Sequence, residues 1–175
     1  MKRRNLFSIL IASLVIMGLL HGCVEKRAPS SQGLPLIKRI AVWDMDDLSV
    51  DQQPYEDFGQ LFSDEILKVL SSRHDVEIVD REQLVRVLEE LNLGSSELAD
   101  QTTRLRLGRL AGANLMIFGA YQYMAGQWRI DLRLVDVETG RIVRTASRSF
   151  TNGDLNYILH QIHAASEELL GPSDR

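Results

Sequence analysis

Residues 115–134 of the chain, LMIFGAYQYMAGQWRIDLRL, decide its fold. The run 115–119 is apolar without interruption, as expected of a central strand that is covered on both faces. Residues 128–134 alternate apolar and charged side chains, which predicts a strand with one buried and one solvated face. A tight turn at 138–140 then predicts that residues 141–150 form a third strand, which pairs back on the second. Three consecutive strands are therefore expected in one sheet.

Upstream of these strands, the spacing of apolar residues changes from that of a strand to that of a helix and back again. Residues 37–43 predict a first strand, and residues 76–79 a short second one. Between them, apolar residues at helical spacing from Phe58 to Leu70 predict a helix with one buried face.

Three further helices follow from apolar stripes and capping residues. Asp80 is expected to cap one helix with Gln83 as its reciprocal partner, and Thr102 or Thr103 to cap the next. Residues 152–154 end the last strand and begin a final helix. The predicted order is β-α-β-α-α-β-β-β-α. We therefore expect one α/β (α+β) domain, with helices packed on a mixed sheet of about five strands.

The N-terminus has the pattern of an export signal. Basic residues 2–4 precede an apolar stretch of roughly 15 residues, which is long enough for a signal peptide and short for a membrane span. It ends in Leu20-His21-Gly22-Cys23, a sequence typical of a lipobox. We expect signal peptidase II to recognise Leu20 and Gly22, and Cys23 to carry the lipid, palmitate among its acyl chains. The alternative is an ordinary signal peptide whose cleavage site happens to contain a cysteine.

Cysteine content and net charge reduce the number of functions that the chain can have. Cys23 is the only cysteine, so no disulfide forms within the chain. Removal of residues 1–22 takes away three of the 20 basic residues and none of the 24 acidic ones, so the net charge changes from −4 to −7. That balance argues against nucleic acid as a partner and leaves membrane attachment to the lipid. Because Val24 rather than Asp follows the cysteine, we expect an outer-membrane address with the domain facing the periplasm.

The domain organisation follows from composition. Residues 1–22 are the expected signal peptide, and 23–36 the lipidated cysteine with a tether rich in Pro, Ser and Gly. Residues 37–171 are the expected folded domain.

Candidate catalytic and metal-binding residues are few. Asp44-Met45-Asp46 after a strand is similar to the D-x-D motif of haloacid-dehalogenase phosphatases, but no lysine follows Lys68 to neutralise a phosphoryl group. We interpret it as a solvated acidic loop. His160 and His163 lie one helical turn apart and lack a third metal ligand. No nucleophile motif and no phosphate-binding loop is present, so we expect no enzyme, cofactor, metal or small-molecule substrate.

Arginines recur on the last two predicted strands, at Arg129, Arg133, Arg144 and Arg148. They are either solvated positions paired with Asp131 and its neighbours, or a basic strip that binds an acidic partner or a polymer such as peptidoglycan. Membrane-spanning strands are a third interpretation, disfavoured because the hairpin lacks aromatic residues at both ends. The four arginines are therefore candidate partner-binding residues.

The folded region resembles the CsgG family of curli-secretion lipoproteins and the N-terminal domain of TolB. The ordered stretches that carry the resemblance are Ile40–Val42, Val79–Leu84, Val87–Glu90, Leu107–Gly108, Gly112–Asn114, Gly119–Tyr121 and Leu134–Ile142. Secretion-channel members insert two hairpins per subunit into the membrane, whereas here only residues 122–127 separate the strands. The resemblance therefore implies a periplasmic domain without the pore.

These observations together predict a non-enzymatic outer-membrane lipoprotein that binds other envelope proteins, or copies of itself, in envelope biogenesis or protein export. Two alternatives remain open. One is a ring-forming accessory subunit of a curli-type secretion channel. The other is a regulator of cell-wall synthesis similar to the activators of penicillin-binding proteins.

The lipid anchor gives a first testable prediction. Replacing Cys23 with Ser removes the thiol that accepts the lipid, so the protein should move from the membrane fraction to the periplasmic fraction. Fractionation followed by immunoblotting measures this change. A variant that remains in the membrane would contradict the predicted anchor.

Overall fold

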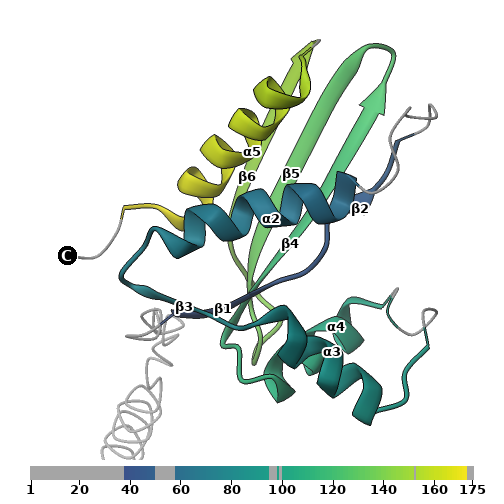
Figure 1. The fold of residues 1–175 in the computed structure, drawn as a ribbon, viewed down its shortest axis with the longest axis vertical. Coiled ribbons are helices and arrows are strands. Elements are labelled where there is room, and N and C mark those ends of the chain that lie inside the picture. The colour runs from purple at the N-terminus through teal and green to yellow at the C-terminus, as the bar shows by residue number, and fades with distance from the viewer. Residues whose placement is uncertain (1–37, 50–57, 95–97, 99, 152, 173–175) are drawn as a thin grey trace, which may run out of the picture. The chain divides into compact units, whose positions relative to one another are not determined.

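The long strand β4 (Leu115–Met124) lies inside a six-stranded mixed sheet (Figure 1). This computed structural model describes residues 38–49, 58–94, 98, 100–151 and 153–172. The order across the sheet is β3 (Val76–Ile78), β1 (Lys38–Val42), β4, β5 (Gln127–Asp136) and β6 (Ile142–Thr151). The sixth strand, β2 (Asp46–Asp47), also pairs with β4. Residues 34–175 form one compact unit.

Parallel and antiparallel pairing meet at β4. On one side β1 and β2 pair with it in parallel, and on the other β5 runs antiparallel over all ten residues. Ala125 and Gly126 connect β4 to β5 with φ angles of 51° and 79°. Positive φ at both central residues is the requirement of a type I′ hairpin turn. The turn pairs Met124 with Gln127 and so sets the register of the hairpin.

The helices cover the two faces of the sheet unequally. One face packs against α2 (Phe58–Ser71) and α5 (Leu155–Leu170). The short helices α3 (Arg81–Glu90) and α4 (Gln101–Leu110) lie together at one end of the domain (Figure 1). The predicted order of elements and the α+β class are confirmed. None of the described helices is long and apolar enough to span a membrane.

Details of the prediction differ from the structure at three places. β2 lies within the predicted acidic loop, because Asp46 and Asp47 extend the edge of β4. Asp80 does occupy the N-cap of α3, but its side chain makes no capping hydrogen bond. The predicted cap at Thr102 or Thr103 is wrong: Asp100 is the cap, and its carboxylate accepts a hydrogen bond from the Thr103 backbone N–H. A carboxylate is a better N-cap acceptor than a β-branched threonine hydroxyl.

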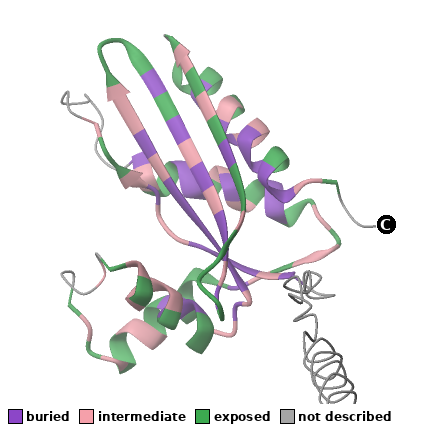
Figure 2. Cartoon of the chain, turned by 180° about the vertical axis from the view of Figure 1, so that it is seen from behind, coloured by how far each residue is buried: buried purple, intermediate pink, exposed green. Residues whose placement is uncertain are grey.

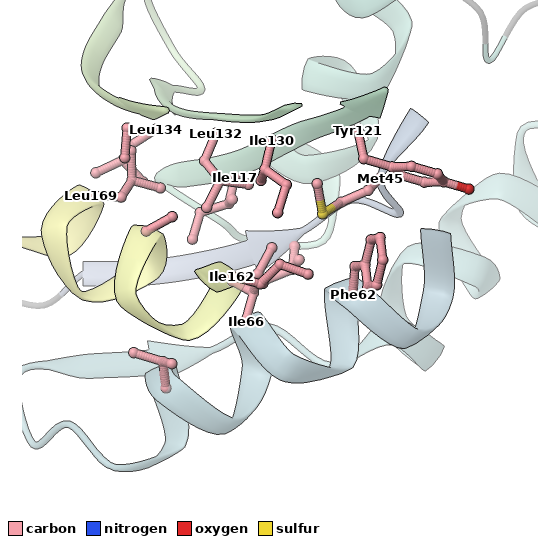
Figure 3. Close-up of a cluster of buried hydrophobic side chains, with 14 of the residues drawn as sticks. Met45, Phe62, Ile66, Ile117, Tyr121, Ile130, Leu132, Leu134, Ile162 and Leu169 are labelled. Carbon is pink, nitrogen blue, oxygen red and sulfur yellow. The ribbon is translucent and has the colours of Figure 1, made fainter. Parts of the chain in front are cut away.

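The main core lies between the sheet and the pair α2–α5 (Figure 3). Four aromatic rings, those of Phe58, Phe62, Tyr121 and Trp128, pack at its α2 end. Phe62 stacks on Phe58 with centroids 5.1 Å apart and meets Tyr121 edge to face at 5.0 Å. Beyond them, Ile66 and Ile162 bring the two helices together over Ile117 and Ile130. These residues are fully buried, so this layer carries most of the apolar burial.

A smaller core lies on the opposite face of the sheet. It joins the lower ends of β4 and β5 to the helical pair through Leu84, Phe118, Val135 and neighbouring residues. Few side chains take part, and α3 buries Leu84 alone. The helices α3 and α4 are therefore held at one end of this face.

The aromatic cluster gives a stability prediction. Phe62→Ala should lower the free energy of unfolding by about 3–5 kcal/mol, because it leaves a cavity among three other rings. Leu110→Ala on α4, where the side chain is 55% exposed, is the control and should change it by about 0.5 kcal/mol or less. Urea unfolding of both variants measures the difference. If both variants changed the free energy of unfolding by the same small amount, the aromatic cluster would not be part of the main core.

Candidate docking surface

The upper part of β4, β5 and β6 has one face that no described helix covers. In the view from behind, these strands lie in front of α2 and α5, and α3 and α4 are confined to their lower end (Figure 2). The cause is the strand alternation: Trp128, Ile130 and Leu132 point to the main core, and the residues between them point the other way. We call this polar surface the open face.

The open face is defined by side chains that the register places side by side. Arg129 pairs with Gln122 and Ser149, Asp131 with Ala120 and Ser147, and Arg133 with Phe118 and Thr145. Directly opposite residues point to the same face of an antiparallel sheet. The polar members are Gln122, Gln127, Arg129, Asp131, Arg133, Thr145, Ser147, Ser149 and Thr151.

The charged residues of the open face were predicted from the sequence, but its hydroxyl residues were not. Four hydroxyl residues, Thr145, Ser147, Ser149 and Thr151, alternate along β6 and are all exposed. That alternation was the available signal. A polar face built from paired strands presents side chains of β4, β5 and β6 together to a macromolecular partner.

Asp131 is held within the open face by its neighbours. Arg129 donates to it through Nε at 2.6 Å and through Nη2 at 3.0 Å, and the Ser147 hydroxyl donates as well. The hydrogen bonds from Arg129, opposed by partial desolvation and reinforced by Ser147, hold the pKa of Asp131 below its usual range. The same contact raises the pKa of Arg129. Both oxygens of this carboxylate are therefore engaged within the domain.

Arg133 differs from the other predicted arginines. Its side chain is half-buried and makes no hydrogen bond or ion pair with any residue that the structure describes. It lies between Phe118, which is 2% exposed, and the exposed Thr145. Its guanidinium interacts with Asp131 through charge alone, without a hydrogen bond or a short ion pair.

Arg144 and Arg148 lie on the opposite face of the sheet, so the four arginines do not form one strip. Nη1 of Arg144 donates to the Leu170 carbonyl at 2.6 Å. Arg148 pairs with Glu168 at 2.7 Å and also donates to the Ala164 carbonyl. Both side chains fasten α5 to β6. The register puts them there, because they pair with Leu134 and Ile130, which face the main core.

The acidic motif after β1 pairs with the two short helices, and its carboxylates stay partly exposed to solvent. Arg81 of α3 pairs with Asp44 through both guanidinium nitrogens. Arg104 of α4 pairs with Asp46 at 2.9 and 3.1 Å and lies over the Trp43 ring at 5.3 Å. Two carboxylates occupied in this way are poorly placed for phosphatase chemistry.

One of the two histidines makes a contact between helices. His163 Nδ1 lies 3.2 Å from Glu65 Oε1 and links α5 to α2, whereas His160 is exposed. Burial raises the pKa of Glu65, but hydrogen bonds from Lys68 and His163 outweigh it, so this pKa is lowered. Within the described part of the chain, no three His, Cys, Asp or Glu residues are grouped to hold a metal ion.

A shallow hollow on α3 is lined by Arg81, Glu82, Val85 and Arg86, and both arginines are already in ion pairs. Leu20, Gly22 and Cys23 lie outside the described residues, as does the tether. Lipidation therefore stays a prediction.

Comparison with known proteins places the chain in a family. The model of the peptidoglycan-synthase activator LpoB matches residues 57–147, so the chain belongs to the LpoB family. No curated protein sequence matches it.

Solved structures share the fold at low sequence identity. The LpoB C-terminal domain from Salmonella enterica is 14% identical, with a TM-score of 0.58, over 69% of this chain and 87% of that one. Lipoprotein GNA1162 from Neisseria meningitidis is 13% identical, with a TM-score of 0.55, over 77% and 97%. The PelC dodecamer from Paraburkholderia phytofirmans is 17% identical, with a TM-score of 0.52, over 80% and 93%.

The expected membership in the CsgG family, with its TolB likeness, is wrong. The matching family is LpoB, and its structures share the fold. The curli-secretion alternative depended on that resemblance and is withdrawn with it. The resemblance followed the order of elements and short turn motifs, which several unrelated functions share.

The ion pair of the open face gives a pH prediction. Because folding lowers the pKa of Asp131, its contribution to stability is present above the unfolded pKa of about 3.9 and is lost as the pH falls through the folded value. Asp131→Asn should therefore reduce the free energy of unfolding at pH 7, by less than about 1 kcal/mol for this partly exposed pair.

Urea unfolding at pH 7 and at pH 3 measures this contribution, and the difference between wild type and variant should shrink at pH 3. A difference that grows on acidification would contradict the assignment.

Proposed function

We propose that this chain is an outer-membrane lipoprotein that binds a peptidoglycan synthase in the periplasm and activates it without catalysing a reaction itself. The observation that carries the proposal is the family match over residues 57–147. The matched region contains β4, β5 and the first part of β6, and with them Arg129, Asp131 and Arg133. Of the functions left open by the sequence, the family match supports the regulator of cell-wall synthesis.

The lipid on Cys23 would hold the domain at the membrane, and residues 24–36 would give it reach. A tether rich in Pro, Ser and Gly extends to at most about 3.6 Å per residue. The domain would thus approach a synthase that extends into the periplasm. With a mature net charge of −7, the domain has little attraction to anionic lipid, which favours a position away from the bilayer surface.

The open face is the surface we propose for docking. It lies on three paired strands, and its side chains are ordered by cross-strand contacts such as the one between Arg129 and Asp131. A preorganised surface loses less side-chain entropy on binding than a flexible one does. The opposite face is occupied by α2 and α5.

Homo-oligomerisation is a second candidate, favoured by the fold shared with the PelC dodecamer. The mass of the lipidated protein in mild detergent, measured by light scattering after size exclusion, distinguishes the two. A ring would support assembly with itself, and a monomer or dimer would support a tethered activator.

Activation is tested with the lipidated chain and a peptidoglycan synthase from the same organism. The initial rate of glycan-strand polymerisation should rise several-fold on addition of the chain, because the family consists of synthase activators. Ser147→Lys, which introduces a bulky charge beside Asp131, should reduce the stimulation. His160→Lys on α5, an exposed position of the opposite face, is the matched control and should not. Equal rates with and without the wild-type chain would refute the proposal.

A further inference from the structure

We infer that Arg133 is the binding point for an aspartate or glutamate of the partner protein on the open face. The inference rests on the proposed function, because it specifies the chemistry of the surface that the synthase would contact. It assigns different roles to four arginines that look alike in the sequence.

The four arginines differ in the contacts that their guanidinium groups make. Arg129 is engaged by Asp131, Arg144 by the Leu170 carbonyl, and Arg148 by Glu168. Arg133 has no such contact with the described residues. Asp131, two residues away on the same strand face, has its oxygens taken by Arg129 and Ser147. The guanidinium of Arg133 is therefore available to a ligand.

A partner that covers the open face changes the solvation of Arg133. Arg133 is already half-buried against the sheet, so a partner that covers the open face would remove much of its remaining water. A guanidinium that is desolvated without an anion is strongly unfavourable. A carboxylate binds it bidentately in a planar fork geometry. The partner is thus required to supply an acidic group there.

The other side chains of the open face determine the charge around Arg133. Arg129 and Asp131 neutralise each other, and the remaining polar side chains of the open face are amides and hydroxyls. Asp131 also feels the charge of Arg133, but one carboxylate cannot balance two guanidinium groups, so the open face is net positive in a chain of net charge −4. Such a charge selects partners by complementarity more than it adds affinity.

A protein carboxylate is favoured over a glycan as the ligand. The face carries no exposed aromatic ring among its described residues, since Phe118 is 2% exposed, so a sugar ring has no surface to stack on. Arginine is enriched at protein–protein interfaces, which favours a protein as the partner of Arg133.

The test uses the full lipidated chain in mild detergent and measures its dissociation constant with the synthase from the same organism. Arg133→Glu should weaken binding about 30-fold or more. Arg133→Gln, which removes the charge without repelling Asp131, should weaken it less. Arg106→Glu is the matched control: this exposed arginine of α4 also lacks a described partner, and its reversal should leave binding unchanged. Unfolding curves of all three variants establish that they fold.

Charge reversal on the partner completes the experiment. Acidic residues of the synthase are changed to lysine one at a time, and one of these variants should bind the Arg133→Glu chain better than the wild-type chain. If the wild-type chain binds and Arg133→Glu binds equally well, the inference is overturned and the proposed function stands. If the Arg133 variants lose binding to purified peptidoglycan and keep binding to the synthase, the protein carboxylate is also overturned. A wild-type chain that binds no synthase instead refutes the proposed function.

Discussion

The register that the Ala125–Gly126 turn sets between β4 and β5 determines the rest of the structure. It pairs Met124 with Gln127, and from there every second residue of β5 faces the main core. A slip by one residue would exchange the two faces and place Arg129 and Arg133 against α2 and α5. Burying these guanidinium groups in an apolar core would be strongly unfavourable, so the chain keeps one register. The core and the open face are therefore consequences of one constraint.

The unequal covering of the sheet follows from the size of its two cores. On one face α2 and α5 bury whole stripes, whereas α3 contributes Leu84 alone to the other. The pairs of Arg81 with Asp44 and of Arg104 with Asp46 orient the short helices, but partly exposed ion pairs add little stability. Leu107 of α4, which is fully buried, and the residues around Phe118 supply the burial. The helical pair is thus confined to one end, and the polar strand residues beyond it stay accessible.

Sequence patterns predicted the elements well because strand alternation and helical stripes are local. They predicted the open-face positions on β5, where apolar and charged residues alternate strictly. They failed to sort Arg144 and Arg148, because β6 has a mixed pattern and a register shift intervenes at Leu134/Val135. The ion pairs of Asp44 and Asp46 join residues 37 and 58 positions apart, which no local pattern reveals. The family was misjudged because turn motifs report the fold rather than the site.

Four arginines in similar strand contexts thus have separate physical roles, and the difference lies in what the register places within their reach. Arg144 and Arg148 reach carbonyls and a carboxylate of α5, so they act within the domain. Arg129 and Ser147 occupy both oxygens of Asp131 with hydrogen bonds, and Arg133 acts on that carboxylate through a weaker charge–charge interaction alone. Two guanidinium groups and one carboxylate leave the open face with a net positive charge for a partner to recognise, and the pairing decides which arginine carries it. The ion pair at Arg129 therefore contributes to recognition indirectly, by leaving the hydrogen-bond donors of the neighbouring guanidinium without an acceptor among the described residues.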